Sequence, residues 1–381
     1  MQFSTRAIHT GQAADPSTGA VTPPIHLSSI YEFSEPGVSK AGYEYIRHGS
    51  PNRHSLEMCL ASLEGAPEEC PALCYSSGMA AIDAAMRLLH PGEKLLLARD
   101  IYGGTISLAE KLLRPNGIHV EYGDTSDIEK FSNAITANTR MVWIETPSNP
   151  LLTLTDIAAV SRAAHSVGAL AAADNTFATP YLQNPLALGV DIVMHSTTKY
   201  LGGHSDLLGG ALVVNDPSLY SQLLTLQKMT GAVASPFDCW LTLRGIRTLS
   251  IRMQKHCENA ASIARFLQTL PQVRKVHYPG LEEQPLFHLA QRQMRGFGGI
   301  VSMEVDPDRA QRILRKTKIF TLAGSLGGVE SIISYPRLMS HSSLSEEERQ
   351  ERGITDGLIR LSIGLEDTAD LIADLEQALE D

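Results

Sequence analysis

The sequence predicts an α/β protein with a mostly parallel sheet and a smaller α/β region towards its carboxyl terminus. Short apolar runs alternate with stretches of helical periodicity through the first half of the chain, which is typical of parallel strands joined by crossover helices. A second group of strand-like runs begins near Val273, after a long helical stretch. The 381 residues are enough for two domains rather than one small core.

The elements follow from local patterns, taken in chain order. Gly, Pro and Ser are spread through residues 1–55, which we expect to be irregular. Apolar residues at helical spacing predict helices over 53–63 and 78–89. Strands and helices are then expected to alternate, with strands at 94–98, 119–122, 141–145, 169–174, 192–195 and 211–214, and helices at 107–113 and 156–167.

The remaining chain predicts a helical stretch and a second sheet. Residues 217–270 are expected to be mostly helical. The later strand-like runs are 276–278, 299–305, 318–322, 332–335 and 358–363. Leu371, Leu375 and Leu379 recur every four residues and predict an amphipathic terminal helix. We therefore expect an amino-terminal arm at 1–55, a large domain at 56–250 and a carboxyl-terminal domain at 251–381.

Composition excludes several classes of partner. The net charge is −10, whereas nucleic acids and anionic membranes bind basic patches. No apolar run approaches the roughly 18 residues of a membrane span, and the amino terminus does not resemble a secretory signal. The five scattered cysteines predict reduced thiols in a cytoplasmic protein. Cys70 and Cys74 have no second pair at zinc-binding spacing, so no metal site is expected.

The run 195–204, His-Ser-Thr-Thr-Lys-Tyr-Leu-Gly-Gly-His, places Lys199 behind hydroxyl side chains and before two glycines. Upstream, Asp174 ends an apolar, strand-like run. Pyridoxal phosphate needs both groups, because a lysine amine binds its aldehyde and a carboxylate keeps its pyridine nitrogen protonated. Each group alone is more often an ordinary surface residue. The two in this order predict a pyridoxal phosphate site, in which a freed Lys199 takes the proton from the substrate Cα.

A phosphate group needs several hydrogen-bond donors, because its charge is too large to bury unpaired. The segment 76–79, Ser-Ser-Gly-Met, precedes a helical run, so its backbone amides can face an anion at a helix start. Glycine there allows close approach of the backbone. The residues expected to bind the phosphate are Ser77, Gly78, Met79, Ser196 and Thr198.

Motifs along nearly the whole chain resemble those of the Cys/Met-metabolism enzymes that use pyridoxal phosphate. The matching segments are 43–47, 76–80, 100–105, 145–150, 174–177, 196–200, 325–328 and 358–362. The resemblance implies fold type I, the fold of aspartate aminotransferase, with a large domain and a smaller carboxyl-terminal α/β domain. It also implies a homotetramer, a dimer of dimers, in which the arm reaches a neighbouring subunit and active sites are shared.

The matching positions carry implied roles. Tyr45 and Arg47 would contact the cofactor phosphate from the adjacent subunit. Tyr102 would stack on the cofactor ring and help to activate the leaving group. The positions that the resemblance assigns to substrate binding are Arg360, Asn149, Ser325 and Glu44. The arginine among them suits the paired hydrogen bonds of a substrate α-carboxylate.

Four positions depart from relatives with charged substrates. Ser107 stands where γ-enzymes that act on cystathionine carry arginine, and Gly324 stands where relatives often carry glutamate. His48 occupies a basic position of γ-synthases, and Gly104 occupies the cysteine position of methionine γ-lyases. The far end of the substrate pocket is therefore expected to be less charged than a dedicated cystathionine site. The residues that could still supply a charge there are Arg114, His48 and Arg337.

We interpret the sequence as a γ-acting enzyme of sulfur amino acids, a carbon–sulfur lyase that eliminates the γ-substituent of cystathionine, homocysteine or related amino acids. The alternatives are γ-replacement on an O-acylhomoserine, as in cystathionine γ-synthases, and methionine γ-lyase activity. A non-catalytic scaffold of the same fold is a distant alternative, and the retention of Lys199, Asp174 and Arg360 argues against it.

Overall fold

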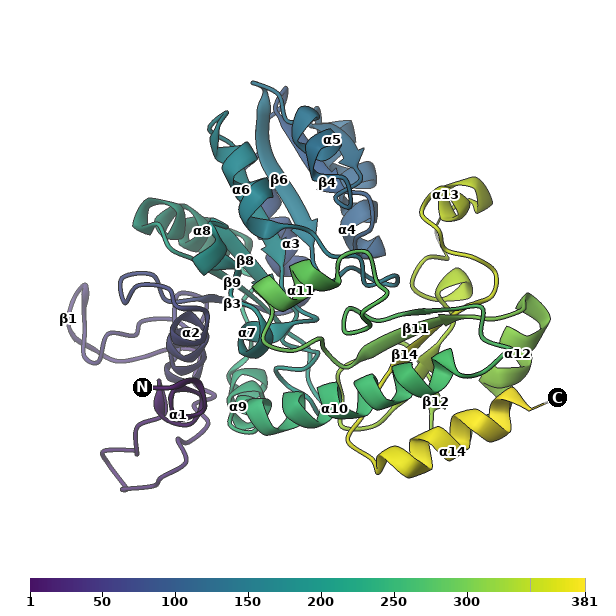
Figure 1. Cartoon of the computed structure of the whole chain (residues 1–381). Coiled ribbons are helices and arrows are strands. Elements are labelled where there is room, and N and C mark those ends of the chain that lie inside the picture. Colours follow the sequence, from purple (N-terminus) through teal and green to yellow (C-terminus); the bar gives the residue numbers. More distant parts are fainter. Residues whose placement is uncertain (343, 381) are drawn as a thin grey trace.

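The computed structural model describes residues 1–342 and 344–380. Its larger sheet is seven-stranded, in the order β3-β9-β8-β7-β6-β4-β5 (Figure 1). The strands are β3 (Leu73–Tyr75), β4 (Lys94–Ala98), β5 (His119–Gly123), β6 (Thr139–Glu145), β7 (Leu170–Asp174), β8 (Ile192–His195) and β9 (Gly210–Val214). The strands from β5 to β8 pair in parallel, whereas β9 is antiparallel to β8 and β3. The predicted α/β class with a mostly parallel sheet is confirmed.

Helices cover this sheet, as its buried strands require. β4 and β9 are buried at every position, which explains their continuous apolar runs. The main covering helices are α2 (Pro51–Glu64), α3 (Gly78–Met86), α4 (Gly103–Leu108), α5 (Ile128–Asn133), α6 (Ile157–His165) and α8 (Pro217–Thr230). Asp156 caps α6 by accepting a hydrogen bond from the Ala159 amide. The helix predicted at 107–113 begins earlier in the structure, because α4 starts at the glycine pair. A π-helical turn over Ala109–Leu113 continues it.

The second sheet lies in the carboxyl-terminal part, in the order β10-β11-β14-β13-β12. Its strands are β10 (Lys275–His277), β11 (Ile300–Glu304), β12 (Thr321–Leu322), β13 (Ile332–Ser334) and β14 (Leu358–Ser362). The helices α10 (Leu249–Gln268), α12 (Pro307–Lys316) and α14 (Thr368–Leu379) share one buried cluster with it. Leu371, Leu375 and Leu379 are buried in that cluster, as their spacing predicted. The long α10 runs beneath both sheets (Figure 1).

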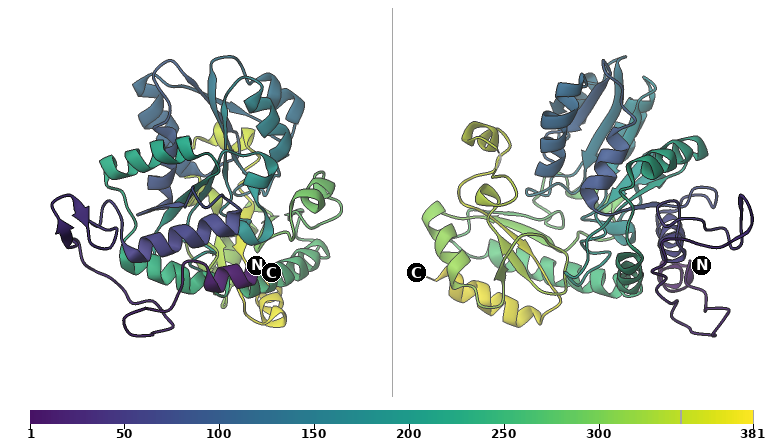
Figure 2. Two further views of the ribbon diagram at one scale, coloured as in Figure 1. Left: turned by 90° about the vertical axis from the view of Figure 1, so that its left-hand side faces the viewer. Right: turned by 180° about the vertical axis from the view of Figure 1, so that it is seen from behind.

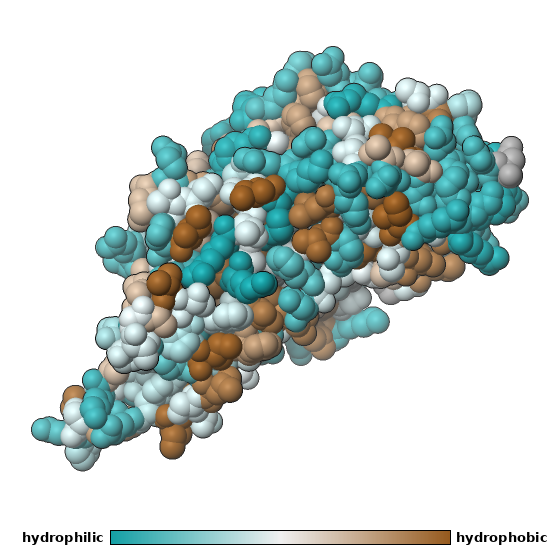
Figure 3. Space-filling model, turned by 90° about the horizontal axis from the view of Figure 1, so that it is seen from below, coloured by the Kyte–Doolittle hydropathy of each residue, from teal (hydrophilic) through white to brown (hydrophobic). Residues whose placement is uncertain are grey.

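The amino-terminal segment extends away from the body of the molecule (Figures 1 and 2). The predicted irregular character of 1–55 holds except for a short helix, α1 (Phe3–His9), a hairpin of β1 (Phe33–Glu35) and β2 (Val38–Ser39), and the start of α2 at Pro51. Only Ala7 of α1 is buried, so the helix leaves no apolar periodicity in the sequence. Apolar side chains stay exposed further along, with Val21 79%, Leu27 73% and Ile30 70% accessible. Figure 3 shows apolar side chains among polar ones along the narrow end of the molecule.

The predicted domain boundaries stay a prediction. The larger sheet falls within 56–250 and the smaller sheet within 251–381. The second range also contains positions 343 and 381, which the structure does not describe. Among the described residues, no helix is long and apolar enough to cross a membrane. Within the same residues, no group of three or more His, Cys, Asp or Glu side chains could hold a metal ion.

Candidate active site

A cavity of about 590 Å³ opens where the carboxyl ends of the parallel strands face the second sheet. In an α/β sheet this edge is where ligands bind, because the loops that follow the strands converge there. The predicted site residues that line the cavity are Lys199, Asp174, Tyr102, Ser77, Gly78, Met79, Ser196, Thr198, Asn149, Ser325 and Arg360. The fold thus gathers into one cavity residues that are spread over more than 280 positions of the sequence.

Lys199 follows β8 and projects into the cavity. Its Nζ donates a hydrogen bond to the Oγ of Ser325 at 2.6 Å. Burial lowers the pKa of the amine to about 8; the positive charge of Arg360 lowers it further, and Asp174 opposes the shift. An appreciable fraction of the amine is therefore neutral near physiological pH, the form that can act as a nucleophile or take up a proton.

Two acids end neighbouring strands beneath the lysine. Asp174 at the end of β7 pairs in register with Glu145 at the end of β6. Burial raises the pKa of both; for Asp174, the Thr176 hydrogen bonds and the charges of His195 and Lys199 oppose the rise. Burial, and then the charge of Asp174, hold the pKa of Glu145 well above its usual value. The negative charge of the pair therefore rests on Asp174, which suits a protonated pyridine nitrogen.

Glu145 is a cavity residue that the sequence reasoning missed. Its carboxyl oxygen accepts a hydrogen bond from the backbone amide of Tyr102 at 2.7 Å. It therefore fixes the turn that carries the tyrosine. The available signal was the acid that ends the run 141–145, which parallels the acid that ends 169–174.

The start of α3 forms an anion cradle at the other side of the cavity. Ser77 caps the helix by accepting a hydrogen bond from the Ala80 amide at 3.1 Å. The first amides of a helix have no partner within it and favour an anion. Two glycines allow the close packing: a Cβ at Gly78 would lie 3.2 Å from the Ser196 Oγ, and one at Gly210 would lie 2.4 Å from the Ser77 carbonyl oxygen.

Thr198 lines the cavity, but its hydroxyl is engaged with the backbone of Gly209. The hydroxyl donates to the Gly209 carbonyl at 3.2 Å and accepts from the Gly209 amide at 3.0 Å. This arrangement fixes the loop behind Lys199 and leaves no free hydroxyl hydrogen. A direct contact of Thr198 with a phosphate stays a prediction.

Arg360 supplies a buried positive charge on β14. Nη1 donates to Asn149 Oδ1 at 2.9 Å and Nη2 donates to the Ser325 carbonyl at 2.7 Å, whereas Nε has no hydrogen-bond partner among the residues that the structure describes. Burial lowers the pKa of the guanidinium to about 10, so the group stays charged at neutral pH. No carboxylate in 1–342 or 344–380 forms an ion pair with it. A buried guanidinium without a counter-ion suits a carboxylate that arrives with a ligand.

Ser325 joins the two positive groups. Its hydroxyl contacts Lys199 and its carbonyl contacts Arg360. The residue has a φ of 77°, a left-handed conformation that non-glycine residues seldom adopt. Such strain persists where the surroundings impose it, and it is concentrated at ligand sites.

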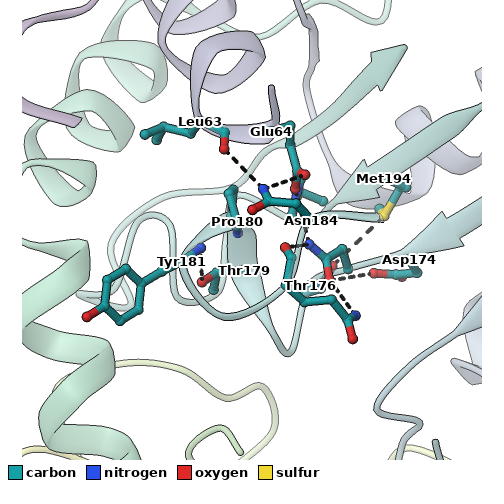
Figure 4. A network of polar contacts seen from close by, with 12 residues as sticks. Leu63, Glu64, Asp174, Thr176, Thr179, Pro180, Tyr181, Asn184 and Met194 are labelled. Carbon is teal, nitrogen blue, oxygen red and sulfur yellow. Dashed lines mark hydrogen bonds and ion pairs between the residues drawn. The ribbon is translucent and has the colours of Figure 1, made fainter. Parts of the chain in front are cut away.

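A buried polar network supports the segment behind Asp174 (Figure 4). Glu64, at the end of α2, accepts a hydrogen bond from Asn184, and the Asn184 amide also donates to the Leu63 carbonyl. On the other side, Glu64 Oε1 lies 2.6 Å from His195 Nε2, and neither side chain is more than 1% exposed. Because β8 ends at His195, this pair ties α2 to the loop that carries Lys199.

Removing one partner of this buried pair is expected to destabilise the fold. Glu64→Ala removes the partner of His195 and one acceptor each of the Asn175 and Asn184 side-chain amides, which should lower the free energy of unfolding by about 3 kcal/mol. Chemical denaturation of the holoenzyme measures the loss. Glu68→Ala, four residues away and exposed, is the matched control and should change it by less than about 0.5 kcal/mol. An equal, small effect of both changes would contradict the structural role of the pair.

The predicted arm residues do not line the cavity of a single chain. Arg47 Nη1 donates to the Lys228 carbonyl at 2.7 Å, and its guanidinium lies 5.5 Å from the ring centre of Tyr45. Glu44 lies 3.9 Å from His48. Tyr45 is 41% exposed, so its ring is available to another molecule. Their position is compatible with a role in a neighbouring subunit.

Among the described residues, the charged side chains that line the cavity are Glu145, Asp174, Lys199 and Arg360, and no further charge lines it. Gly324 lines it, whereas Ser107 is half-buried in α4 and does not. Two of the three candidate substitutes are already paired, Arg114 with Glu110 at 2.7 Å and Arg337 with Asp356 at 2.9 Å. The third, His48, lies on the arm.

The cavity fits pyridoxal phosphate. It offers an amine that can be neutral, a buried carboxylate, an anion cradle at a helix start and, with Tyr102, an aromatic ring. When bound, the cofactor supplies an electron-poor ring that stabilises negative charge at the substrate Cα. Lys199 would hold its aldehyde, Asp174 its ring nitrogen, and Ser77, Gly78, Met79 and Ser196 its phosphate.

Comparisons with known proteins agree with this assignment. The model of the Cys/Met metabolism PLP-dependent enzyme family matches residues 4–380. The chain is 48% identical to a cystathionine beta-lyase of Coxiella burnetii, over 99% of this chain and 97% of that protein. It is 46% identical to a cystathionine gamma-lyase of Dictyostelium discoideum, over 100% and 98%. The solved cystathionine gamma synthase of Xanthomonas oryzae pv. oryzae superimposes with a TM-score of 0.96 at 43% identity, covering 100% of this chain and 98% of that one.

These relatives are named for different reactions, so the likeness establishes the family but does not by itself decide the reaction. With the match over nearly its whole length, the chain belongs to the Cys/Met-metabolism family of pyridoxal-phosphate-dependent enzymes.

Proposed function

We propose that this enzyme catalyses γ-elimination on cystathionine, homocysteine or related γ-substituted amino acids, as cystathionine γ-lyases do. One observation supports the proposal most: each charged side chain of the described residues that lines the cavity already has a proposed role in holding the cofactor, the substrate carboxylate or the turn of Tyr102. These side chains are Glu145, Asp174, Lys199 and Arg360. The part of the wall that this chain contributes would then select weakly by charge, which suits a lyase of broad specificity for the γ-substituent.

Three residues of the chain would have separate roles in the reaction. Arg360, held by Asn149 and Ser325, would fix the substrate α-carboxylate through paired hydrogen bonds. Lys199, beside it, would take the proton from Cα and return protons to the carbon chain and leaving group, since its pKa of about 8 suits both directions. Tyr102, at the cavity mouth on the turn fixed by Glu145, would stack on the cofactor ring and assist the leaving sulfur.

The same proposal includes the assembly. Tyr45, Arg47 and Glu44 of one subunit would complete the cavity of its neighbour. The phosphate would then lie between Arg47 of one subunit and the start of α3 of the other. The exposed apolar side chains of the arm support a buried position in an oligomer. We propose a homotetramer, a dimer of such dimers, in the cytoplasm, where the described cysteines would stay free as they are here.

Cystathionine γ-synthase activity is the second candidate. An uncharged far wall also admits the acyl group of an O-acylhomoserine, and the superimposed synthase shares the fold. Methionine γ-lyase activity is less well supported. A Cβ at Gly104, where those enzymes carry cysteine, would lie 2.3 Å from a Tyr102 ring carbon and 2.7 Å from the Met79 sulfur.

Product analysis under single turnover tests the proposal. Cystathionine, methionine, homocysteine and O-acylhomoserines are each supplied with and without cysteine. The expected result is release of cysteine and a four-carbon 2-oxo acid from cystathionine without any added thiol. Formation of cystathionine from an O-acylhomoserine and cysteine, with no elimination of cystathionine, would contradict the proposal and favour the synthase.

Adding a negative charge at Gly324 is expected to change the substrate preference. A Cβ there meets no atom within 4 Å, so a side chain can begin at this position without displacing a neighbour. The carboxylate of Gly324→Glu would pair with a distal ammonium and raise kcat/KM for cystathionine relative to methionine about tenfold, or about 1.4 kcal/mol. Gly324→Gln, of equal size and no charge, is the control. Equal ratios for the two variants would show that Gly324 does not face the substrate's far end.

A further inference from the structure

The segment 339–341 forms a wall of the cavity that the sequence reasoning did not single out. Met339 and Ser340 line the cavity. A Cβ at Gly103 would lie 2.8 Å from the Ser340 carbonyl oxygen, so this segment packs directly on the start of α4 beside Tyr102. The backbone of Ser340 thus contacts the turn that would carry the leaving-group tyrosine.

His341 fixes the direction of that hydroxyl. Its Nδ1 lies 2.9 Å from the Ser340 Oγ, and its ring also forms a hydrogen bond with the Asn149 carbonyl. Because Nδ1 faces Ser340, Nε2 is the nitrogen left to bond to the Asn149 carbonyl. A carbonyl only accepts, so Nε2 carries the hydrogen. Burial, with the charges of Arg360 and Arg352, lowers the pKa of His341 to about 4, so the ring is neutral at pH 7. Nδ1 is then an acceptor, and the Ser340 hydroxyl donates to it.

The hydroxyl of Ser340 therefore offers the cavity only acceptor lone pairs. Its position is tied to the carboxylate-binding group, because Asn149 accepts from Arg360 through Oδ1 and from His341 through its carbonyl. His341 is 1% exposed, so water does not compete for its nitrogens. One continuous set of contacts thus fixes an acceptor relative to the guanidinium that would hold the substrate α-carboxylate.

We propose that Ser340 is a specificity residue, held as a hydrogen-bond acceptor by the positioning residue His341, for amino acids whose distal end donates a hydrogen bond. This inference rests on the proposed function and narrows it. A distal ammonium or thiol, as in cystathionine or homocysteine, gains an interaction at this wall. A methyl thioether or an ester has no hydrogen to donate and gains nothing.

The test compares kcat/KM for cystathionine and methionine in Ser340→Ala, Ser340→Thr and Ser342→Ala holoenzymes. Ser340→Ala is expected to lower the value for cystathionine about tenfold, mainly through KM, and that for methionine less than about twofold. Ser340→Thr keeps the hydroxyl and the preference. Ser342, two residues on and exposed, donates its hydroxyl hydrogen to the Met339 carbonyl and does not line the cavity, so Ser342→Ala is expected to leave both values unchanged. His341→Gln should weaken the preference in the same direction, because the hydroxyl is then free to rotate.

Binding provides a second readout that needs no turnover. Each amino acid is titrated into the holoenzyme while the visible absorbance of the cofactor is followed. If the wild type binds both amino acids and eliminates neither, the proposed function fails, and the binding ratio still decides the role of Ser340. Equal losses for both amino acids in Ser340→Ala, or no loss for either, would overturn the inference. Equal cofactor content in all variants shows that each one folds.

Discussion

Replacing Lys199 with alanine is expected to abolish turnover, with kcat below about one thousandth of the wild-type value, or roughly 4 kcal/mol of lost transition-state stabilisation. Lys199 is the amine that projects into the cavity, 2.6 Å from Ser325 and with a pKa of about 8. If Lys199 holds the cofactor and moves the protons as proposed, its loss removes both functions at once. Steady-state product release measures the effect, and the visible absorbance reports the attachment.

Lys255→Ala is the control for this change. Lys255 lies on α10 and pairs with Glu258 on the surface, 3.4 Å away. It should keep full activity and normal absorbance. Substantial turnover by Lys199→Ala would show that another group performs the proton transfers.

Mixing two inactive variants, Arg47→Ala and Lys199→Ala, is expected to restore activity. If the arm completes the neighbouring cavity, a hybrid dimer has one cavity with both lesions and one with neither. Random assembly from equal amounts makes half of the dimers hybrids, so about a quarter of the wild-type activity should return. The subunits are mixed under dissociating conditions, reassembled and assayed.

The matched control mixes Asp174→Ala with Lys199→Ala. Asp174 and Lys199 line the same cavity of one chain, so every cavity in that hybrid carries a lesion. No activity should return. If neither mixture regains activity although hybrids form, the cavity does not depend on the Arg47 of a second subunit.

The parts of the site that follow strands could be predicted from the sequence. Two apolar runs, one ending on an acid and one followed by a serine, predicted β7 and β8. They also predicted where Asp174 and the loop that carries Lys199 lie. The helix start at Ser77 was likewise visible as a Ser-Gly pair before a helical run. Such signals are local, because a parallel strand and the loop after it are adjacent in the chain.

Contacts between distant segments could not be predicted in this way. Glu64 and His195 are 131 positions apart, and only the packing of α2 against the end of β8 brings them together. His341 meets Asn149 in the same manner, although the two lie on segments far apart in the sequence. β3 escaped prediction because three residues carry too little pattern, although they pair along their whole length with β9.

Reduction of the holoenzyme with borohydride, followed by mass mapping of its peptides, tests the central claim most directly. Borohydride fixes the cofactor permanently to the amine that holds it. The account predicts one labelled peptide, the one that contains Lys199, and no label in Lys199→Ala. A label on another lysine, with Lys199 unmodified, would contradict the assignment of the cavity as the site of pyridoxal phosphate.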